Sequence, residues 1–97
     1  MKIALFLNDE KLKAMNAEAF AAFLLEIADN IIVSVENDLL YSKNLNYISL
    51  WLLKKQVNIL YILSADDTIR SYFKRIDVEV KTFEDLKDNP ILNLFLR

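Results

Sequence analysis

The chain has 97 residues, a size at which one domain closes around a single hydrophobic core. Hydrophobic residues make up 55% of it, which excludes an intrinsically disordered protein. Twelve basic and 14 acidic residues give a formal net charge of −2 without a dense Lys/Arg cluster, so we expect no nucleic-acid partner. Because no stretch approaches the ~20 apolar residues of a membrane span, we expect a cytoplasmic protein without a membrane partner.

Glycine, histidine and cysteine are all missing from the sequence. Without cysteine there are no disulfides, thiolate nucleophiles or thiolate ligands for iron–sulfur clusters. Without glycine a phosphate-binding loop cannot form, because such loops need the close backbone approach that glycine permits. Without histidine the chain lacks the commonest general base and the commonest transition-metal ligand. The composition therefore predicts a non-enzymatic protein with no cofactor.

The N-terminal part of the chain begins with a predicted central strand. Residues 2–7 are apolar at nearly every position, which is typical of a strand that is buried on both faces. Residues 9–15 are polar and tolerate a helix, and Leu12 and Met15 have the spacing of one apolar helix face. We expect one or two helical turns there.

A β-hairpin is predicted next, over residues 20–28 and 31–35. The second run is rich in the β-branched residues that favour strands. Asp29 and Asn30 tolerate left-handed backbone better than other non-glycine residues, so they can form a tight turn. The alternative is a helix over residues 14–27, since Ala, Glu and Leu are good helix formers.

Strands and helices alternate in the second half of the chain. Ser42 or Asn44 can cap a helix over residues 44–56, and Ser64 to Asp67 can cap another over residues 68–75. Thr82 and Asp85 form a variant of the capping box at a third helix start. The predicted strands of this half are residues 57–63 and 78–81, the second with the alternation of an edge strand. The sequence therefore predicts an α/β fold with a mixed five-stranded sheet, an antiparallel hairpin and βαβ crossovers.

This layout resembles the dinitrogenase iron–molybdenum cofactor biosynthesis family, the NifX/NafY-like domains. The segments that carry the resemblance are Met1-Lys2-Ile3-Ala4, Phe23-Leu24-Leu25-Glu26-Ile27, Asp29-Asn30-Ile31-Ile32-Val33-Ser34-Val35, Leu52-Leu53-Lys54-Lys55-Gln56-Val57-Asn58-Ile59-Leu60, Ile76-Asp77-Val78-Glu79-Val80 and Thr82-Phe83-Glu84-Asp85-Leu86. The resemblance spans nearly the whole chain. It implies one domain over residues 1–97 with a three-layer, ribonuclease-H-like fold, and an accessory function related to that of cofactor carriers.

The chain departs from this family at the residues that would hold a cofactor. Members carry a His-Phe-Gly-Arg-like segment where this sequence has about Asn16-Ala17-Glu18-Ala19, and glycines where it has Gln56 and Ser64-Ala65-Asp66-Asp67. The resemblance therefore implies a diverged, non-enzymatic binding domain that lacks the family's cluster-binding residues.

Acidic side chains offer a second interpretation. Asp9 follows the first strand, and Asp66 and Asp67 follow the strand predicted at residues 57–63, where open α/β sheets usually bind ligands. Together they could hold a divalent cation for hydrolysis. We favour the simpler interpretation, in which these residues cap a helix and interact with its dipole.

Apolar side chains offer a third interpretation, self-association. The helix predicted at residues 44–56 is apolar nearly all round, and the C-terminal residues 91–96 are apolar as well. Tyr47, Trp51 and Phe95 are of the residue types that anchor protein interfaces. The sequence therefore predicts a homodimer through these residues, with an unidentified protein partner as the alternative.

Overall fold

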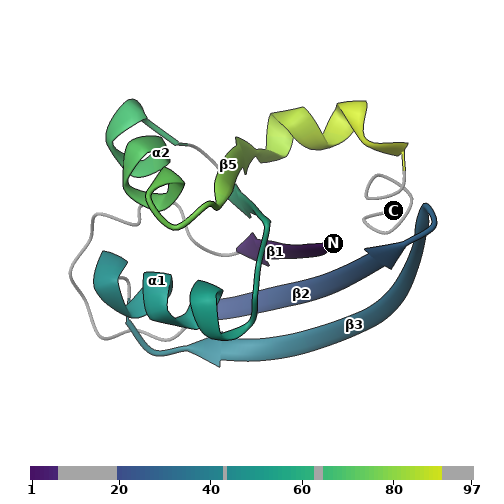
Figure 1. Cartoon of the computed structure of the whole chain (residues 1–97), viewed down its shortest axis with the longest axis horizontal. Helices are drawn as coiled ribbons and strands as arrows, with labels where there is room; N and C mark the ends of the chain where they lie inside the picture. Colours follow the sequence, from purple (N-terminus) through teal and green to yellow (C-terminus); the bar gives the residue numbers. More distant parts are fainter. Residues whose placement is uncertain (7–19, 43, 63–64, 91–97) are drawn as a thin grey trace.

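Five strands form one mixed sheet in the order β3-β2-β1-β4-β5 (Figure 1). The computed structural model describes residues 1–6, 20–42, 44–62 and 65–90. The elements are β1 (Lys2–Phe6), β2 (Phe20–Ala28), β3 (Ile31–Leu40), α1 (Leu45–Lys54), β4 (Ile59–Ile62), α2 (Asp67–Lys74), β5 (Glu79–Thr82) and the 3-10 helix η1 (Phe83–Asp88). The predicted α/β class and the mixed five-stranded sheet are confirmed.

Strand β1 is the centre of the sheet, as its uninterrupted apolar sequence predicts. It pairs antiparallel with β2 on one side and parallel with β4 on the other. Outside these pairs, β2 continues antiparallel into β3, and β4 continues parallel into β5. All four residues from Ile3 to Phe6 are buried, because each face of a central strand needs an apolar side chain.

Two apolar clusters lie on opposite faces of this sheet. Ala4 and Phe6 pack in one cluster with Ile48 and Leu52 of α1 and with residues of α2. The alternate β1 residues, Ile3 and Leu5, belong to the second cluster, with Leu25 and Tyr61. Since successive strand residues point to opposite faces, both faces of the sheet carry a core, as a three-layer fold requires.

The hairpin turn is the one predicted from its residue types. Asp29 and Asn30 have φ angles of 54° and 64°, the left-handed conformation that a two-residue turn needs. The β2–β3 ladder runs from the pair Phe20–Leu40 to the pair Ala28–Ile31. The alternative helix is wrong for the described part of residues 14–27. Residues 7–19, which include the short helix predicted at residues 9–15, lie outside the described residues.

Strand β3 is longer than predicted, because it continues beyond residue 35 through Glu36, Asn37 and Asp38 to Leu40. Polar residues are tolerated there since β3 is an edge strand. Asp38 is also held in place from α1. Its Oδ2 accepts a 2.8 Å hydrogen bond from Trp51 Nε1 and lies 3.9 Å from Lys55 Nζ.

Both described α-helices begin at predicted capping residues. Asn44 Oδ1 accepts hydrogen bonds from the backbone N–H groups of Asn46 and Tyr47 at the start of α1. Asp66 Oδ1 accepts a 2.9 Å bond from Ile69 N at the start of α2. These bonds satisfy amide groups that have no partner within the helix. No helix in the described ranges is both long and apolar enough to cross a bilayer.

Replacing Asn30 by glycine should leave stability unchanged or raise it by up to about 1 kcal/mol, because glycine adopts the positive φ of this position without strain. Asn30→Ala is the matched control and should cost about 1 kcal/mol, since its Cβ disfavours this conformation. Urea denaturation measures both values. A loss above ~1 kcal/mol for the glycine variant would contradict the turn geometry.

Candidate functional site

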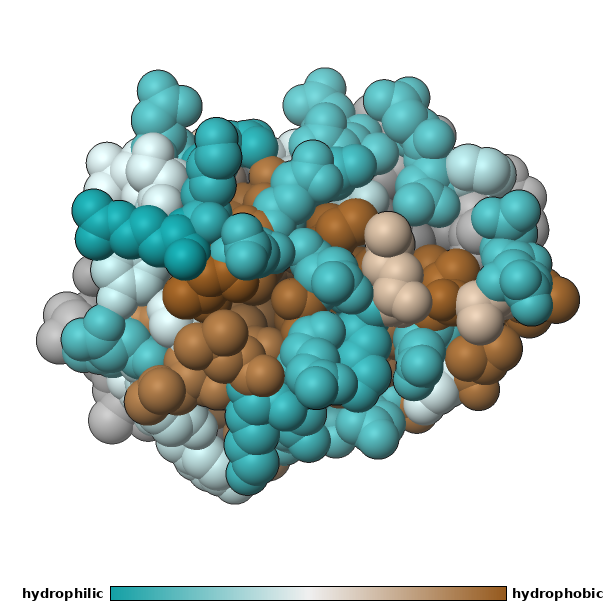
Figure 2. All heavy atoms as spheres, in the orientation of Figure 1, coloured by the Kyte–Doolittle hydropathy of each residue, from teal (hydrophilic) through white to brown (hydrophobic). Residues whose placement is uncertain are grey.

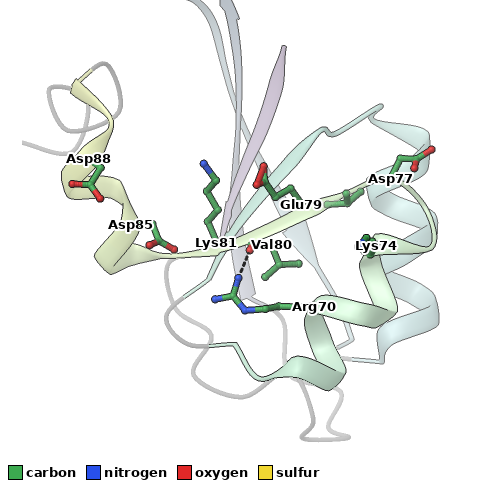
Figure 3. Close-up of a pocket in the computed structure, with 9 residues that line it drawn as sticks. Arg70, Lys74, Asp77, Glu79, Val80, Lys81, Asp85 and Asp88 are labelled. Atoms are coloured by element: carbon green, nitrogen blue, oxygen red, sulfur yellow. Dashed lines mark hydrogen bonds between the residues drawn. The ribbon is translucent and has the colours of Figure 1, made fainter.

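A hollow of about 640 Å³ lies between α2, β5 and η1 (Figure 3). We call it the β5 hollow. Seven of its nine lining residues are charged, namely Arg70, Lys74, Asp77, Glu79, Lys81, Asp85 and Asp88, and the other two are Val78 and Val80. Three cationic and four anionic side chains therefore share one concave surface.

Two of these charged groups already have structural partners. Arg70 reaches from α2 to β5, where its Nη1 donates a 2.7 Å hydrogen bond to the Val80 carbonyl (Figure 3). Asp85 Oδ2 accepts a 2.9 Å bond from Thr82 N, which is one of the two bonds of the predicted capping box, and a 3.2 Å bond from Thr82 Oγ1. Both contacts cover polar backbone groups of the edge strand β5, so they serve the fold first.

The carboxylates of the β5 hollow are spread along it. Figure 3 shows Asp77 and Asp88 at opposite ends, with Glu79 and Asp85 between them. Within the described residues no three His, Cys, Asp or Glu side chains converge as metal ligands would. The hollow can form weak, water-exposed ion pairs with a small polar molecule. Its geometry aligns no nucleophile with a base.

Hydrogen bonding lowers the pKa of the Asp85 carboxyl below its ordinary range. The main cause is the bond from the backbone N–H of Thr82, with the Thr82 hydroxyl and the charges of Arg70 and Lys81 acting in the same direction. This carboxyl therefore supports the folded state above its unfolded pKa of about 4, and the support is lost as pH falls through the lower folded value. A carbon-detected NMR titration should give a midpoint below about pH 4, and an unshifted midpoint would contradict the capping geometry.

Asp66 and Asp67, two of the acidic residues singled out in the sequence, lie at the start of α2. Asp66 is the cap of α2, and Asp67 lies in its first turn. Asp9 lies outside the described residues. The helix-cap interpretation is therefore confirmed for Asp66.

The predicted interface residues take up different positions. Trp51 is half-buried against the core, with its ring 6.0 Å from that of Phe6 and its N–H bonded to Asp38. Tyr47 is also half-buried, and its hydroxyl accepts a 3.3 Å bond from Tyr41 N. Phe95 lies outside the described residues. The structure thus places the two aromatic rings beside the α1–sheet contact.

Two aliphatic side chains form the apolar surface of α1 instead. Leu50 is 68% exposed and Leu53 is 51% exposed, one turn apart on the side away from the buried Ile48 and Leu52. Figure 2 shows an apolar area over α1 with hydrophilic side chains around it. The sequence showed that this helix is apolar nearly all round, with Leu45, Ile48 and Leu52 spaced along one face, and that face is the one that packs on the sheet.

No family model and no curated protein matches the sequence. Among solved structures, the crystal structure of PH0822 is similar in fold, with a TM-score of 0.64 over 84% of this chain and 78% of that one. The two sequences are 13% identical. At this identity the similarity shows the fold alone.

Proposed function

We propose that this chain is a non-enzymatic binding domain, an accessory protein that acts by docking to another protein. The observation that carries the proposal is the exposure of Leu50 and Leu53 on α1, beside the half-buried rings of Tyr47 and Trp51. Apolar side chains grouped on a surface and surrounded by polar ones mark interaction sites. The surface of α1 fits this description.

The residue types of the chain support the same proposal. Binding of iron–sulfur clusters and soft transition metals relies chiefly on cysteine and histidine, which are also the commonest thiolate nucleophile and general base, and this sequence contains neither. The resemblance to NifX/NafY-like domains suggests a relative of cofactor carriers in which the cofactor ligands are gone. What such a domain retains is its protein-binding surface.

Co-purification from the native host tests this proposal. The wild-type chain and a Leu50→Glu/Leu53→Glu variant are compared as baits by quantitative mass spectrometry. We expect a partner whose recovery falls at least about tenfold with the variant, because a charge in an apolar contact is costly. Ser71→Glu, which introduces the same charge at an exposed position on α2, is the control. Identical recoveries with all three baits would contradict the proposal.

A second candidate function is that of a homodimeric interaction module, and the same leucines favour it. A twofold axis beside α1 would bring Leu50 and Leu53 of two copies together, and twofold dimers are the commonest closed assemblies. Sedimentation equilibrium at micromolar concentration should then show a dimer that Leu53→Glu converts to a monomer. A wild-type chain that sediments as a monomer throughout would exclude this candidate.

A further inference from the structure

The outer edge of β3 carries backbone groups that point away from the sheet. Ile27 and Met1 exchange hydrogen bonds of 2.8 and 2.9 Å, so the backbone groups of Ile27 face β1. Because the direction alternates along a strand, those of Leu24 face β3 and meet Glu36, its partner in the ladder. The alternate residues of β3, which are Val35, Asn37 and Leu39, therefore direct their N–H and C=O groups outward.

The side-chain contacts of the described residues agree with this assignment. Leu39 N donates a 2.9 Å bond to Asp38 Oδ1 instead of to β2. That contact covers one outward N–H and leaves Val35 and Asn37 as the open part of the edge. Among the described strands, none pairs with this side of β3.

The two edges of the sheet differ in this respect. On β5 the Arg70 guanidinium covers the Val80 carbonyl, and the Asp85 carboxylate covers the Thr82 N–H. Such side-chain caps prevent another strand from pairing with an edge. On β3, the contacts among the described residues cover Leu39 alone in this way. The β3 edge, which we define as Val35, Glu36 and Asn37, is thus the place where the sheet can be extended.

Side chains of opposite character line the two faces of this edge. Val35 is 48% exposed and lies opposite Leu25 on one face, and Leu39, 51% exposed, follows on the same face four residues further along. Glu36 is exposed on the other face, opposite Leu24. An added strand would therefore meet the apolar Val35 and Leu39 and the amide of Asn37 on one face, and acidic side chains on the other.

The charge of the hairpin restricts what can bind there. Residues 20–42 contain four of the chain's 14 acidic residues and none of its 12 basic ones. A second copy fits poorly. If β3 of a second copy paired antiparallel with this edge, a twofold axis at Asn37 would place Glu36 of one copy opposite Asp38 of the other. An axis at Glu36 would place the two Glu36 side chains opposite each other. Both arrangements are destabilising, because they set like charges directly opposite. An axis at Val35 would bring Asn37 against Val33, the extra residue where the ladder shifts register.

We propose that the β3 edge binds, as an added strand, an extended segment of another protein in which apolar and basic residues alternate. This inference rests on the proposed function, that the chain docks to proteins, and names a second surface and the chemistry of its ligand. Main-chain hydrogen bonds to Val35 and Asn37 would supply affinity, as in other domains that bind peptides by strand addition. Lysine or arginine beside Glu36 would supply selectivity.

An NMR titration with short peptides tests the proposal on the intact chain. The probe is acetyl-Lys-Val-Lys-Val-Lys-Val-amide, and its controls are the same peptide with glutamate for lysine and a block peptide with three lysines before three valines. We expect the alternating lysine peptide to shift the Val35 and Asn37 amide signals and to bind at least about tenfold more tightly than either control. Glu36→Lys should weaken the binding by a similar factor.

N-methylation of the peptide distinguishes strand addition from looser contact without altering the protein. In an antiparallel added strand, the residues opposite Val35 and Asn37 direct their N–H groups at the edge. These residues are the valines. Methylating the backbone nitrogens of the valines should therefore abolish binding, whereas methylating the backbone nitrogens of the lysines should leave the affinity within about threefold. In a parallel added strand the two sets exchange roles, which equally supports the proposal. Equal effects of the two sets would overturn it.

The remaining outcomes test the edge proposal and the proposed docking function separately. Binding that shifts α1 signals but neither Val35 nor Asn37 would overturn the edge proposal and leave the docking function intact. No binding by any peptide at millimolar concentration would also overturn the edge proposal, while the Leu50→Glu/Leu53→Glu co-purification still judges the docking function. A titration in which the chain dimerises through β3 would overturn the choice of ligand.

Discussion

Leu52→Ala should lower the free energy of unfolding by about 2–5 kcal/mol, whereas Leu53→Ala, the next residue along α1, should change it by about 0.5 kcal/mol or less. The chemical change is the same in both variants. Leu52 has no exposed surface and packs on the sheet, so its truncation leaves a cavity among apolar neighbours. Half of the Leu53 surface already contacts solvent.

Urea denaturation of the two variants beside the wild type measures this difference. The exposed apolar surface of α1 requires that Leu52 faces the sheet and Leu53 faces away from it, and the pair of variants reports on that directly. Similar losses for both residues would mean that α1 is covered on both sides. That result would remove the exposed apolar surface from which the docking function is argued.

Trp51→Glu should cost about 3 kcal/mol or more of stability. The substitution removes the ring that packs beside Phe6 and places a carboxylate next to that of Asp38, which accepts the indole N–H in the wild type. Two like charges in a half-buried site repel each other, and the lost packing adds to the cost. Thermal unfolding measures the effect.

Leu53→Glu is the matched control for this substitution, since it introduces the same charge on the exposed side of the same helix. We expect the melting temperature of this variant to lie within a few degrees of the wild-type value, because substitutions at exposed positions usually change stability little. If the Trp51→Glu variant keeps wild-type stability and loses only self-association, Trp51 lies in the interface that the sequence predicted and does not stabilise the fold.

Short-range signals predicted most of the fold. The apolar run of β1, the capping residues Asn44 and Asp66, and the turn at Asp29 and Asn30 each act on neighbouring backbone, so their effect can be read from a few adjacent residues. Alternation of strands and helices then predicted the parallel pairing of β4 and β5.

Long-range contacts explain what the sequence did not predict. The polar residues 36–38 look like the end of a strand, but Asp38 is held there by Trp51, 13 residues further along. The β5 hollow depends on Arg70 reaching the Val80 carbonyl on another element. Neither contact has a local signature, because side-chain partners across a fold are set by how the elements pack.

The candidate surfaces were only partly predictable for the same reason. The spacing of Leu45, Ile48 and Leu52 indicated the core face of α1, but it did not indicate which of the remaining apolar residues are exposed. Trp51 and Tyr47 are typical interface residues, yet large rings also fill the contact between a helix and a sheet. The smaller Leu50 and Leu53 are the exposed ones.

Site-specific photocrosslinking in the native host tests the central claim, that this chain works by docking to a protein, most directly. A benzophenone amino acid replaces Leu53 on the α1 surface or, as the control, Lys74 beside the β5 hollow. Light is expected to join the chain to one defined protein from position 53, in an adduct that position 74 does not give. A crosslinked second copy would select the homodimer among docking functions. Equal adducts from both positions, or none from position 53, would contradict the account.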